Sequence, residues 1–374
     1  MRDRMLVLEN GKTYMGRGFG SEKQAVARLV FNTEMVGYQE VLSDPSYCGN
    51  IVVMSYPLIG NYGLTDEDYE SKGVHIGGFV IREYNDNPSN FRFTQKVSQV
   101  MEDNDVPGIA GVDTREIVKI IRDEGEMLAM ITDADRDLNE CLEEMKKYSE
   151  PKNLVSKVST RGIWYARTRN PKYTVVAIDC GLQRSLLKSL TDAACNVIVV
   201  PYDTPYEVIE NHKPSGVLIS SGPGSPFDLE CIVETIQKLK YLTPILGVGL
   251  GHELVALSYG AKIQALCAGK RGSNIPVMNL IEDKVYIVEQ NNSYCVDAKS
   301  LKGCSLKVIY ESICDGTVEG LMNEGDMVIS SQFIPQANGF VLNKFISFMD
   351  KLALADNLVV NRYQHEKPAK YNKD

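Results

Sequence analysis

The sequence contains no long apolar run. No stretch approaches the roughly 18 apolar residues that a membrane-spanning helix needs. The apolar segment Met5–Leu8, which follows a charged N-terminus, is too short for the core of a signal peptide. We therefore expect a protein that is neither secreted nor inserted in a membrane.

Paired cysteines are also absent. The nine cysteines are scattered, with no C-x-x-C and no cysteine–histidine pairing at zinc-site spacing. Their odd number favours free thiols in a reducing compartment, the cytoplasm, over a disulfide framework. The chain has no G-x-x-x-x-G-K-[ST] phosphate loop, which argues against nucleotide binding through such a loop. We expect neither a metal nor a bound cofactor.

Positive charge is in deficit. Forty Lys and Arg stand against 49 Asp and Glu, a net charge of −9, which argues against a nucleic-acid or anionic-membrane surface. With 44% hydrophobic and 24% charged residues the composition is that of a globular protein, and 374 residues predict two or three domains. Small molecules or another protein are the expected partners.

The first half of the chain predicts a mixed α/β domain over residues 1–150. Asn10-Gly11 predicts a tight hairpin, because this pair readily adopts the positive φ angles that such turns need. Amphipathic periodicity predicts a helix at Thr114–Ile121 with Asp113 as its N-cap. Further expected elements are strands at Ala27–Phe31, Ile51–Met54 and Val74–Ile81 and helices at Val97–Met101 and Leu138–Tyr148.

The second half predicts a different architecture. Prolines and a polar run predict a linker at 151–172, and a polar tail is expected at 356–374. Between them, over 173–355, short apolar strands alternate with turns and helices, which is typical of a mainly parallel sheet flanked by helices. Two glycine-rich turns, Ser220–Pro226 and Gly247–Glu253, follow strands of this sheet. Since such sheets bind ligands at the carboxyl ends of their strands, we expect the functional site there.

One of these turns has the pattern of a nucleophile elbow. Gly247-Val-Gly-Leu-Gly251 reads as G-x-nucleophile-x-G between a strand and a helix. Its central residue, Gly249, has no side chain that could attack a substrate. The sequence thus predicts the scaffold of nucleophilic catalysis without its reagent.

Several motifs occur together and in order along the chain. They include Phe31-Asn-Thr-Glu-Met-Val-Gly-Tyr-Gln-Glu40, Gly111-Val-Asp-Thr-Arg115, Ser220-Ser-Gly-Pro-Gly-Ser-Pro226, Gly247-Val-Gly-Leu-Gly-His252 and Asp315-Gly-Thr-Val-Glu-Gly320. From about residue 5 to residue 350, the chain resembles the small subunit of carbamoyl phosphate synthetase, whose C-terminal half is a class I glutamine amidotransferase domain. The resemblance implies a partner, the large subunit that binds ATP and makes carbamoyl phosphate.

The resemblance also implies a catalytic triad of cysteine, histidine and glutamate that hydrolyses glutamine through a thioester. The cysteine position in G-x-C-x-G-H-Q is Gly249. The histidine and glutamate positions in Q-G-H-P-E are Ile334 and Gln336. None of the three can perform the family's chemistry, so we predict that glutaminase activity is absent and that no residue of this chain is catalytic.

A glutamine pocket is implied as well, and the chain departs from its pattern. A carboxylate at Glu253, where the family has glutamine, is expected to repel the α-carboxylate of the substrate. Ser293, where the family has glycine, is expected to obstruct a close backbone approach. The predicted vestigial pocket consists of Ser46, Gly222, Gly224, Leu250, Glu253, Asn291, Ser293 and Tyr294.

Structural roles compete with functional ones at several positions. The glycines of the G-P-G turn fit the needs of a tight turn, and His252 fits a packed or capping residue better than a catalyst. Cys267 and Cys295 lie near the site in the family's fold, but free cysteines are more often buried apolar residues than displaced nucleophiles. We interpret Lys270-Arg271 and the lysine-rich tail as solvated charge.

Three functional hypotheses follow. The first is an inactive small subunit, a scaffold or regulator that supports carbamoyl phosphate synthesis from free ammonia, for arginine or for pyrimidine biosynthesis. The second is a free-standing pseudo-amidotransferase that acts as a binding or regulatory module. The third is residual glutamine-dependent synthesis as in the family. Association with a large subunit distinguishes the first from the second.

Overall fold

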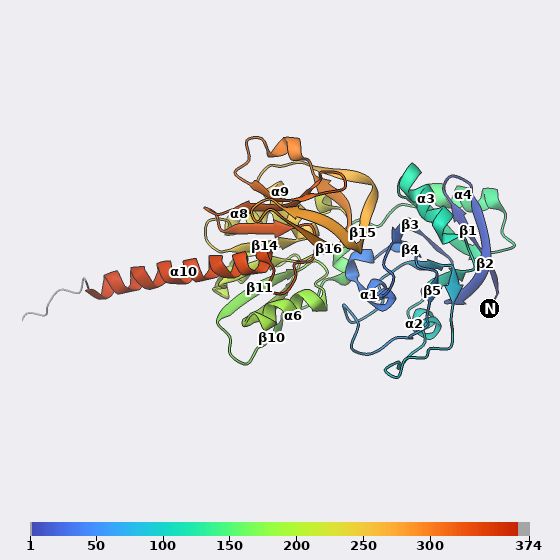
Figure 1. The fold of residues 1–374 in the computed structure, drawn as a ribbon, viewed down its shortest axis with the longest axis horizontal. Coiled ribbons are helices and arrows are strands. Elements are labelled where there is room, and N and C mark those ends of the chain that lie inside the picture. Colours follow the sequence, from blue (N-terminus) through green and yellow to red (C-terminus); the bar gives the residue numbers. More distant parts are fainter. Residues whose placement is uncertain (1, 366–374) are drawn as a thin grey trace, which may run out of the picture.

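A closed barrel lies beside a larger open sheet in the computed structural model, which describes residues 2–365 (Figure 1). The barrel strands follow the order β1-β2-β8-β6-β4-β3-β9. They are β1 (Asp3–Leu8), β2 (Thr13–Gly20), β3 (Ala25–Asn32), β4 (Asn50–Met54), β6 (Gly78–Ile81), β8 (Pro107–Ala110) and β9 (Met127–Asp133). The other elements of this part are α1 (Tyr38–Ser43), the 3-10 helix η1 (Pro45–Tyr47), β5 (Leu58–Ile59), β7 (Glu83–Tyr84), α2 (Val97–Asp103), α3 (Thr114–Glu124) and α4 (Leu138–Lys147). The mixed α/β prediction is confirmed.

Local sequence signals explain several of these elements. Gly11 has a φ of 85° in the turn between β1 and β2, which pair antiparallel as the hairpin prediction required. Helix α3 starts after Asp113, whose carboxylate accepts a hydrogen bond from the Glu116 amide at 3.0 Å. The strand expected at Val74–Ile81 is shorter than predicted, because only its last four residues form β6.

The second part is a ten-stranded sheet in the order β10-β12-β11-β13-β14-β19-β18-β16-β15-β17. Its strands are β10 (Trp164–Ala166), β11 (Tyr173–Asp179), β12 (Cys195–Pro201), β13 (Gly216–Ile219), β14 (Ile245–Val248), β15 (Ile263–Asn279), β16 (Lys284–Val296), β17 (Lys307–Ser312), β18 (Val318–Asn323) and β19 (Val328–Ser331). Strands β12, β11, β13, β14 and β19 run parallel, as predicted. Strands β15 to β18 form an antiparallel extension that the sequence does not predict.

Helices cover both faces of the parallel strands. They are α6 (Arg184–Asp192), α7 (Tyr206–Asn211), α8 (Glu230–Leu239), α9 (Leu250–Ser258) and α10 (Phe340–His365). Leu186 of α6 and Phe345 of α10 belong to one apolar core, while Ile236 of α8 and Leu254 of α9 belong to another. Nearly continuous apolar strands such as β11 follow from this burial on two faces.

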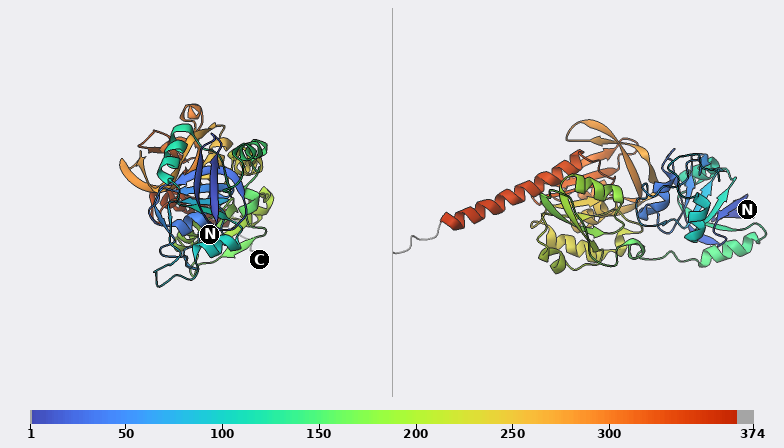
Figure 2. Two further views of the ribbon diagram at one scale, coloured as in Figure 1. Left: turned by 90° about the vertical axis from the view of Figure 1, so that its right-hand side faces the viewer. Right: turned by 90° about the horizontal axis from the view of Figure 1, so that it is seen from below.

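The segment expected to be a linker, 151–172, carries secondary structure of its own. It contains α5 (Val155–Val158) and β10, which pairs antiparallel with β12 at the edge of the sheet. At the other end of the chain, α10 extends away from the rest of the molecule (Figures 1 and 2) and includes residues 356–365 of the expected polar tail. Residues 366–374 of that tail lie outside the described residues. Within the part of the chain that the structure describes, no helix is both long and apolar enough to cross a membrane.

Candidate functional site

Strand β14 enters helix α9 through Gly249, whose φ and ψ angles are 56° and −114°. Residues with a side chain rarely adopt this backbone conformation. The flanking glycines are needed for close packing, since a Cβ on Gly251 would lie 2.2 Å from the carbonyl oxygen of Ile219. The strand, turn and helix of an elbow are therefore all present, and the turn carries no reactive side chain.

The G-P-G turn after β13 lies next to the elbow. A Cβ at Gly249 would be 3.1 Å from the Cβ of Ser221, so a side chain there would contact this second turn. At Gly222 a Cβ would be 2.2 Å from the carbonyl oxygen of Cys180. Backbone packing thus accounts for the glycine at 222 without any ligand, in agreement with its structural interpretation.

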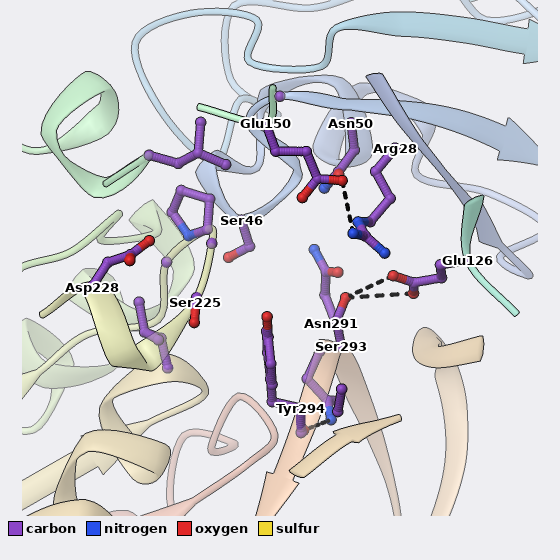
Figure 3. A pocket seen from close by; sticks show the side chains of 18 of the residues that line it. Arg28, Ser46, Asn50, Glu126, Glu150, Ser225, Asp228, Asn291, Ser293 and Tyr294 are labelled. Carbon is purple, nitrogen blue, oxygen red and sulfur yellow. Dashed lines mark hydrogen bonds and ion pairs between the residues drawn. The ribbon is translucent and has the colours of Figure 1, made fainter. Parts of the chain in front are cut away.

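A cavity of about 420 Å³ lies beside these turns, between the barrel and the sheet (Figure 3). Residues of both parts of the chain line it, from Arg28 and Glu126 to the start of α9 and the end of β16. The structure brings together all eight residues of the predicted pocket, which are Ser46, Gly222, Gly224, Leu250, Glu253, Asn291, Ser293 and Tyr294.

Asp44 connects two of these residues, Ser46 of its own domain and Asn291 of the sheet domain. The Asp44 carboxylate caps η1 by accepting a hydrogen bond from the Ser46 amide at 2.9 Å. Its other oxygen accepts from the Asn291 side-chain amide of β16 at 3.2 Å. Burial raises the pKa of the Asp44 carboxyl. The loop that carries Ser46 is therefore tied to the sheet domain.

A buried ion pair forms another wall of the cavity. Arg271 of β15 and Glu126 of the barrel domain are 3% and 4% exposed, with Nη1 2.5 Å from Oε1. The Ser293 hydroxyl accepts a hydrogen bond from Arg271 Nη2. It donates one to Glu126 Oε2 at 3.2 Å (Figure 3). Ser293 thus joins this pair rather than simply filling space that glycine would leave.

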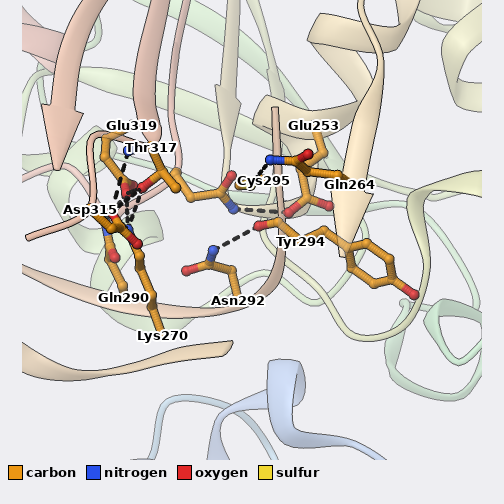
Figure 4. Close-up of polar contacts among 11 residues, drawn as sticks. Glu253, Gln264, Lys270, Gln290, Asn292, Tyr294, Cys295, Asp315, Thr317 and Glu319 are labelled. Carbon is orange, nitrogen blue, oxygen red and sulfur yellow. Dashed lines mark hydrogen bonds and ion pairs between the residues drawn. The ribbon is translucent and has the colours of Figure 1, made fainter. Parts of the chain in front are cut away.

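The interpretation of Lys270-Arg271 as solvated charge is wrong. The Lys270 side chain is 13% exposed, and its ammonium lies 2.8 Å from carboxylate oxygens of both Asp315 and Glu319 (Figure 4). It also donates a hydrogen bond to the Thr317 hydroxyl. These partners lie 45 to 49 residues away in the sequence, so no local pattern could reveal them.

Glu253 lines the cavity and is 3% exposed. Its Oε1 accepts a hydrogen bond from Gln332 Nε2 at 3.0 Å. Burial raises the pKa of Glu253 to about 8. Near neutral pH the group is therefore mostly a neutral acid, which corrects the expectation of a carboxylate that repels its ligand.

The other two triad positions do not line the cavity in the described part of the chain. Ile334 packs against the apolar core of the sheet domain. Gln336 is exposed, and its amide donates to the carbonyl oxygen of Ile287 at 3.2 Å. Neither side chain offers a base.

His252 is packed, as expected. It is fully buried, its Nδ1 lies 2.9 Å from the Ser330 hydroxyl, and burial lowers its pKa to about 3. The two cysteines considered as displaced nucleophiles do not line the cavity either. Cys295 is 1% exposed, and burial raises the pKa of its thiol, which disfavours the reactive thiolate. Cys267 is exposed and offers its carbonyl to the Glu126 amide.

Comparison with known proteins gives the family. The family model described as "Carbamoyl-phosphate synthase small chain, CPSase domain" matches residues 6–131, and that of "Glutamine amidotransferase class-I" matches residues 176–347. The chain is 39% identical over 353 residues to the carbamoyl phosphate synthase pyrimidine-specific small chain of Halalkalibacterium halodurans, a match that covers 93% of this chain and 97% of that protein. The chain belongs to the carbamoyl phosphate synthase small chain family.

Two further small chains are similar to the same extent. That of Oceanobacillus iheyensis is 37% identical over 355 residues, covering 93% of this chain and 96% of its own. That of Fusobacterium nucleatum is 38% identical over 356 residues, covering 94% of this chain and 99% of its own. The cavity of this chain spans both matched regions, because Ser46 and Glu126 fall in the first and Leu250 in the second.

Proposed function

We propose that this small-chain family member has no glutaminase chemistry and serves as a scaffold or regulator for a large chain that makes carbamoyl phosphate from free ammonia. The observation that carries the proposal is Gly249 at the centre of the elbow, where a nucleophile would have to stand. A thioester cannot form without a thiol at this position. Loss of the nucleophile of such a unit costs on the order of 10⁶ in rate, by analogy with subtilisin.

The rest of the cavity offers no replacement. Among the described residues that line it there is neither a cysteine nor a histidine. The hydroxyl of Ser293 is engaged by Arg271 and Glu126. An uncharged serine without a base is a poor nucleophile, so we infer that glutamine would not be hydrolysed even if it were bound.

The barrel domain supplies a surface suited to a protein partner. Phe91, Val36 and Met35 are 94%, 73% and 71% exposed. They belong to adjoining loops, because the Gly37 amide donates to the Tyr62 hydroxyl and the Ser89 amide donates to the Asn61 carbonyl. Exposed aromatic and aliphatic side chains grouped in this way are typical of interaction surfaces. We propose that a large chain docks here, in the cytoplasm, where the nine free cysteines stay reduced.

To test the proposal, this chain is coexpressed with a carbamoyl phosphate synthase large chain from the same organism, and the formation of carbamoyl phosphate by the copurified chains is measured. We expect the two chains to copurify and ammonium chloride to support carbamoyl phosphate formation, while glutamine at the same concentration does not and no glutamate is released. A glutamine-hydrolysing small chain, assayed in parallel, is the positive control. Glutamate release that disappears when Cys267 and Cys295 are replaced by alanine would instead support residual glutamine-dependent synthesis.

The persistence of the cavity favours a second candidate, a free-standing pseudo-amidotransferase that binds a ligand. About 420 Å³ between the domains is enough for a small molecule. This candidate predicts that no large chain copurifies at any ratio of expression. The pathway served, arginine or pyrimidine, follows from which carbamoyl-transferring enzyme is encoded beside the gene.

A further inference from the structure

A second cavity, of about 670 Å³, lies where the barrel domain, the 151–172 segment and the sheet domain meet. It shares no lining residue with the cavity beside the elbow. Its apolar wall is formed by Tyr69, Trp164, Leu182 and Leu187. A volume of this size lies within the range of small-molecule sites, roughly 300 to 1,000 Å³.

The cavity occupies a favourable place in the sheet. Asp179, the last residue of β11, lines it, and the chain passes from β11 to β12 on one side and then to β13 on the other. A crevice at the carboxyl end of a strand where the strand order reverses is the usual ligand position in open α/β sheets. The location thus agrees with a binding role.

Three carboxylates line the wall, and each accepts hydrogen bonds from the protein; Asp66 accepts one from the Thr94 hydroxyl at 3.2 Å. Asp179 accepts hydrogen bonds from the amides of Thr160, Gly181 and Leu182 at 2.8 to 3.0 Å. Glu70 accepts from the amide and hydroxyl of Ser185, so it occupies the N-terminus of α6. Asp179 and Glu70 are therefore not left to bind a cation from solution.

The cations around the cavity have fewer partners, although Arg184 Nη1 donates a long hydrogen bond, at 3.4 Å, to the Glu67 carbonyl oxygen. Lys72, Arg161 and Arg184 all line it, and none of them forms an ion pair with a carboxylate among residues 2–354, whose side chains the structure describes. The Lys72 ammonium lies 6.0 Å from the centroid of the Trp164 ring. Such a contact is worth about 0.5–1 kcal/mol at an exposed site, so the ammonium can leave it for an anion.

We propose that this cavity binds a small aromatic anion, with its ring against Trp164 and its carboxylate or phosphate near Lys72, Arg161 and Arg184. The apolar wall and the indole favour a planar ring. The three cations favour a negative charge at its edge. Because the wall includes residues from both domains, a bound ligand joins them and stabilises the folded chain.

Trp164 is the only tryptophan of the chain, so its fluorescence reports on this cavity alone. The full-length protein is titrated with adenosine monophosphate and with benzoate, and with adenosine and inorganic phosphate as controls that lack one half of the chemistry. We expect a saturable change in fluorescence with at least one of the first two and none with either control. A response to the nucleotide alone assigns the phosphate form, and one to benzoate alone assigns the carboxylate form. No saturable response to either overturns the proposal.

Variants that remove positive charge distinguish binding in this cavity from non-specific attraction of an anion to surface cations. Replacing Lys72 and Arg161 together by glutamine should weaken binding at least about tenfold, as expected for the loss of charge-assisted hydrogen bonds. Arg167→Gln is the matched control, because Arg167 follows β10, lies 5.9 Å from the Tyr165 ring and does not line the cavity. If Arg167→Gln weakens binding as much as the double variant does, the proposal is wrong.

Discussion

Arg271 and Glu126 form a buried ion pair between the two domains, at 3% and 4% side-chain exposure. The two residues are 145 positions apart, and the hydroxyl of Ser293 bonds to both. Two charges removed from water in this way are stable only together, because each one alone would lack compensation. The pair therefore couples the stability of the domain interface to the wall of the cavity.

Removing one partner should destabilise the chain strongly. We expect Glu126→Ala to lower the free energy of unfolding by about 3–5 kcal/mol, because it leaves the Arg271 guanidinium buried without its counterion. Urea unfolding followed by circular dichroism measures this loss. The control is Glu143→Ala, which breaks an exposed pair with Lys146 and should leave the stability nearly unchanged. Equal losses in the two variants would contradict the role assigned to the buried pair.

The buried acid Glu253 predicts a pH dependence of stability. Burial raises its pKa from 4.5 to about 8 in the folded chain. Between these pH values the folded chain keeps a proton that the unfolded chain has released, so stability falls as pH rises, by at most about 1.4 kcal/mol per pH unit from this group. Below pH 4.5 both states hold the proton, and above pH 8 neither does, so the loss stops there.

Glu253→Gln tests this dependence. Glutamine has the shape of the neutral acid and can accept the same hydrogen bond from Gln332, but it cannot ionise. The variant should therefore be more stable than the parent at pH 8 and nearly equal to it at pH 5. Unfolding by urea at a series of pH values measures the difference. Glu230→Gln, at an exposed position of α8, should show no such trend. The prediction is wrong if the difference in free energy of unfolding between the parent and Glu253→Gln is the same at both pH values.

Much of the fold follows from local signals in the sequence. The hairpin at Gly11, the cap at Asp113 and the apolar strand β11 each depend on residues within a few positions of one another. The long strands β15 and β16 escaped prediction because their exposed and buried residues do not alternate regularly, and their pairing contains bulges. A bulge shifts which side chains face the core, so the two-residue alternation by which a sequence reveals a strand is lost.

The site likewise has features that the sequence predicts and features that it does not. Motif positions could be predicted because the family resemblance fixes them one by one, and all eight pocket residues line one cavity. The Arg271–Glu126 pair, the Lys270 cluster and the protonated state of Glu253 could not, because each depends on burial among residues distant in sequence. The sequence alone assigns Lys270 and Arg271 to solvent, whereas the fold leaves their side chains only 13% and 3% exposed.

Restoring the triad should not restore the enzyme. We expect the combined variant Gly249→Cys, Ile334→His and Gln336→Glu to release glutamate from glutamine at a rate close to background. The cysteine would stand on the strained turn of the elbow, but positions 334 and 336 do not line the cavity, and the pocket would still contain Glu253 and Ser293. A glutamate-release assay measures the rate.

Adding Glu253→Gln and Ser293→Gly to that variant should raise the rate above the triad variant alone, because they restore the family's residues in the wall of the cavity. The same two substitutions in the parent chain, which lacks the thiol, are the control and should release nothing. Full activity with the triad alone would show that Glu253 and Ser293 are harmless, which would contradict this account of the pocket.

Phe91 should contribute most to association with a large chain, since its side chain is 94% exposed at the surface that we assign to docking. Buried aromatic residues at the centre of an interface commonly contribute 2 kcal/mol or more, so Phe91→Ser should weaken association by about 30-fold. Because the side chain is almost wholly in solvent, the substitution should leave the thermal unfolding of the free chain unchanged. Ile313→Ser, at a position 51% exposed in the sheet domain, is the control and should bind the large chain as the parent does. Biolayer interferometry with the immobilised large chain measures both, and unchanged affinity in Phe91→Ser would place the docking surface elsewhere.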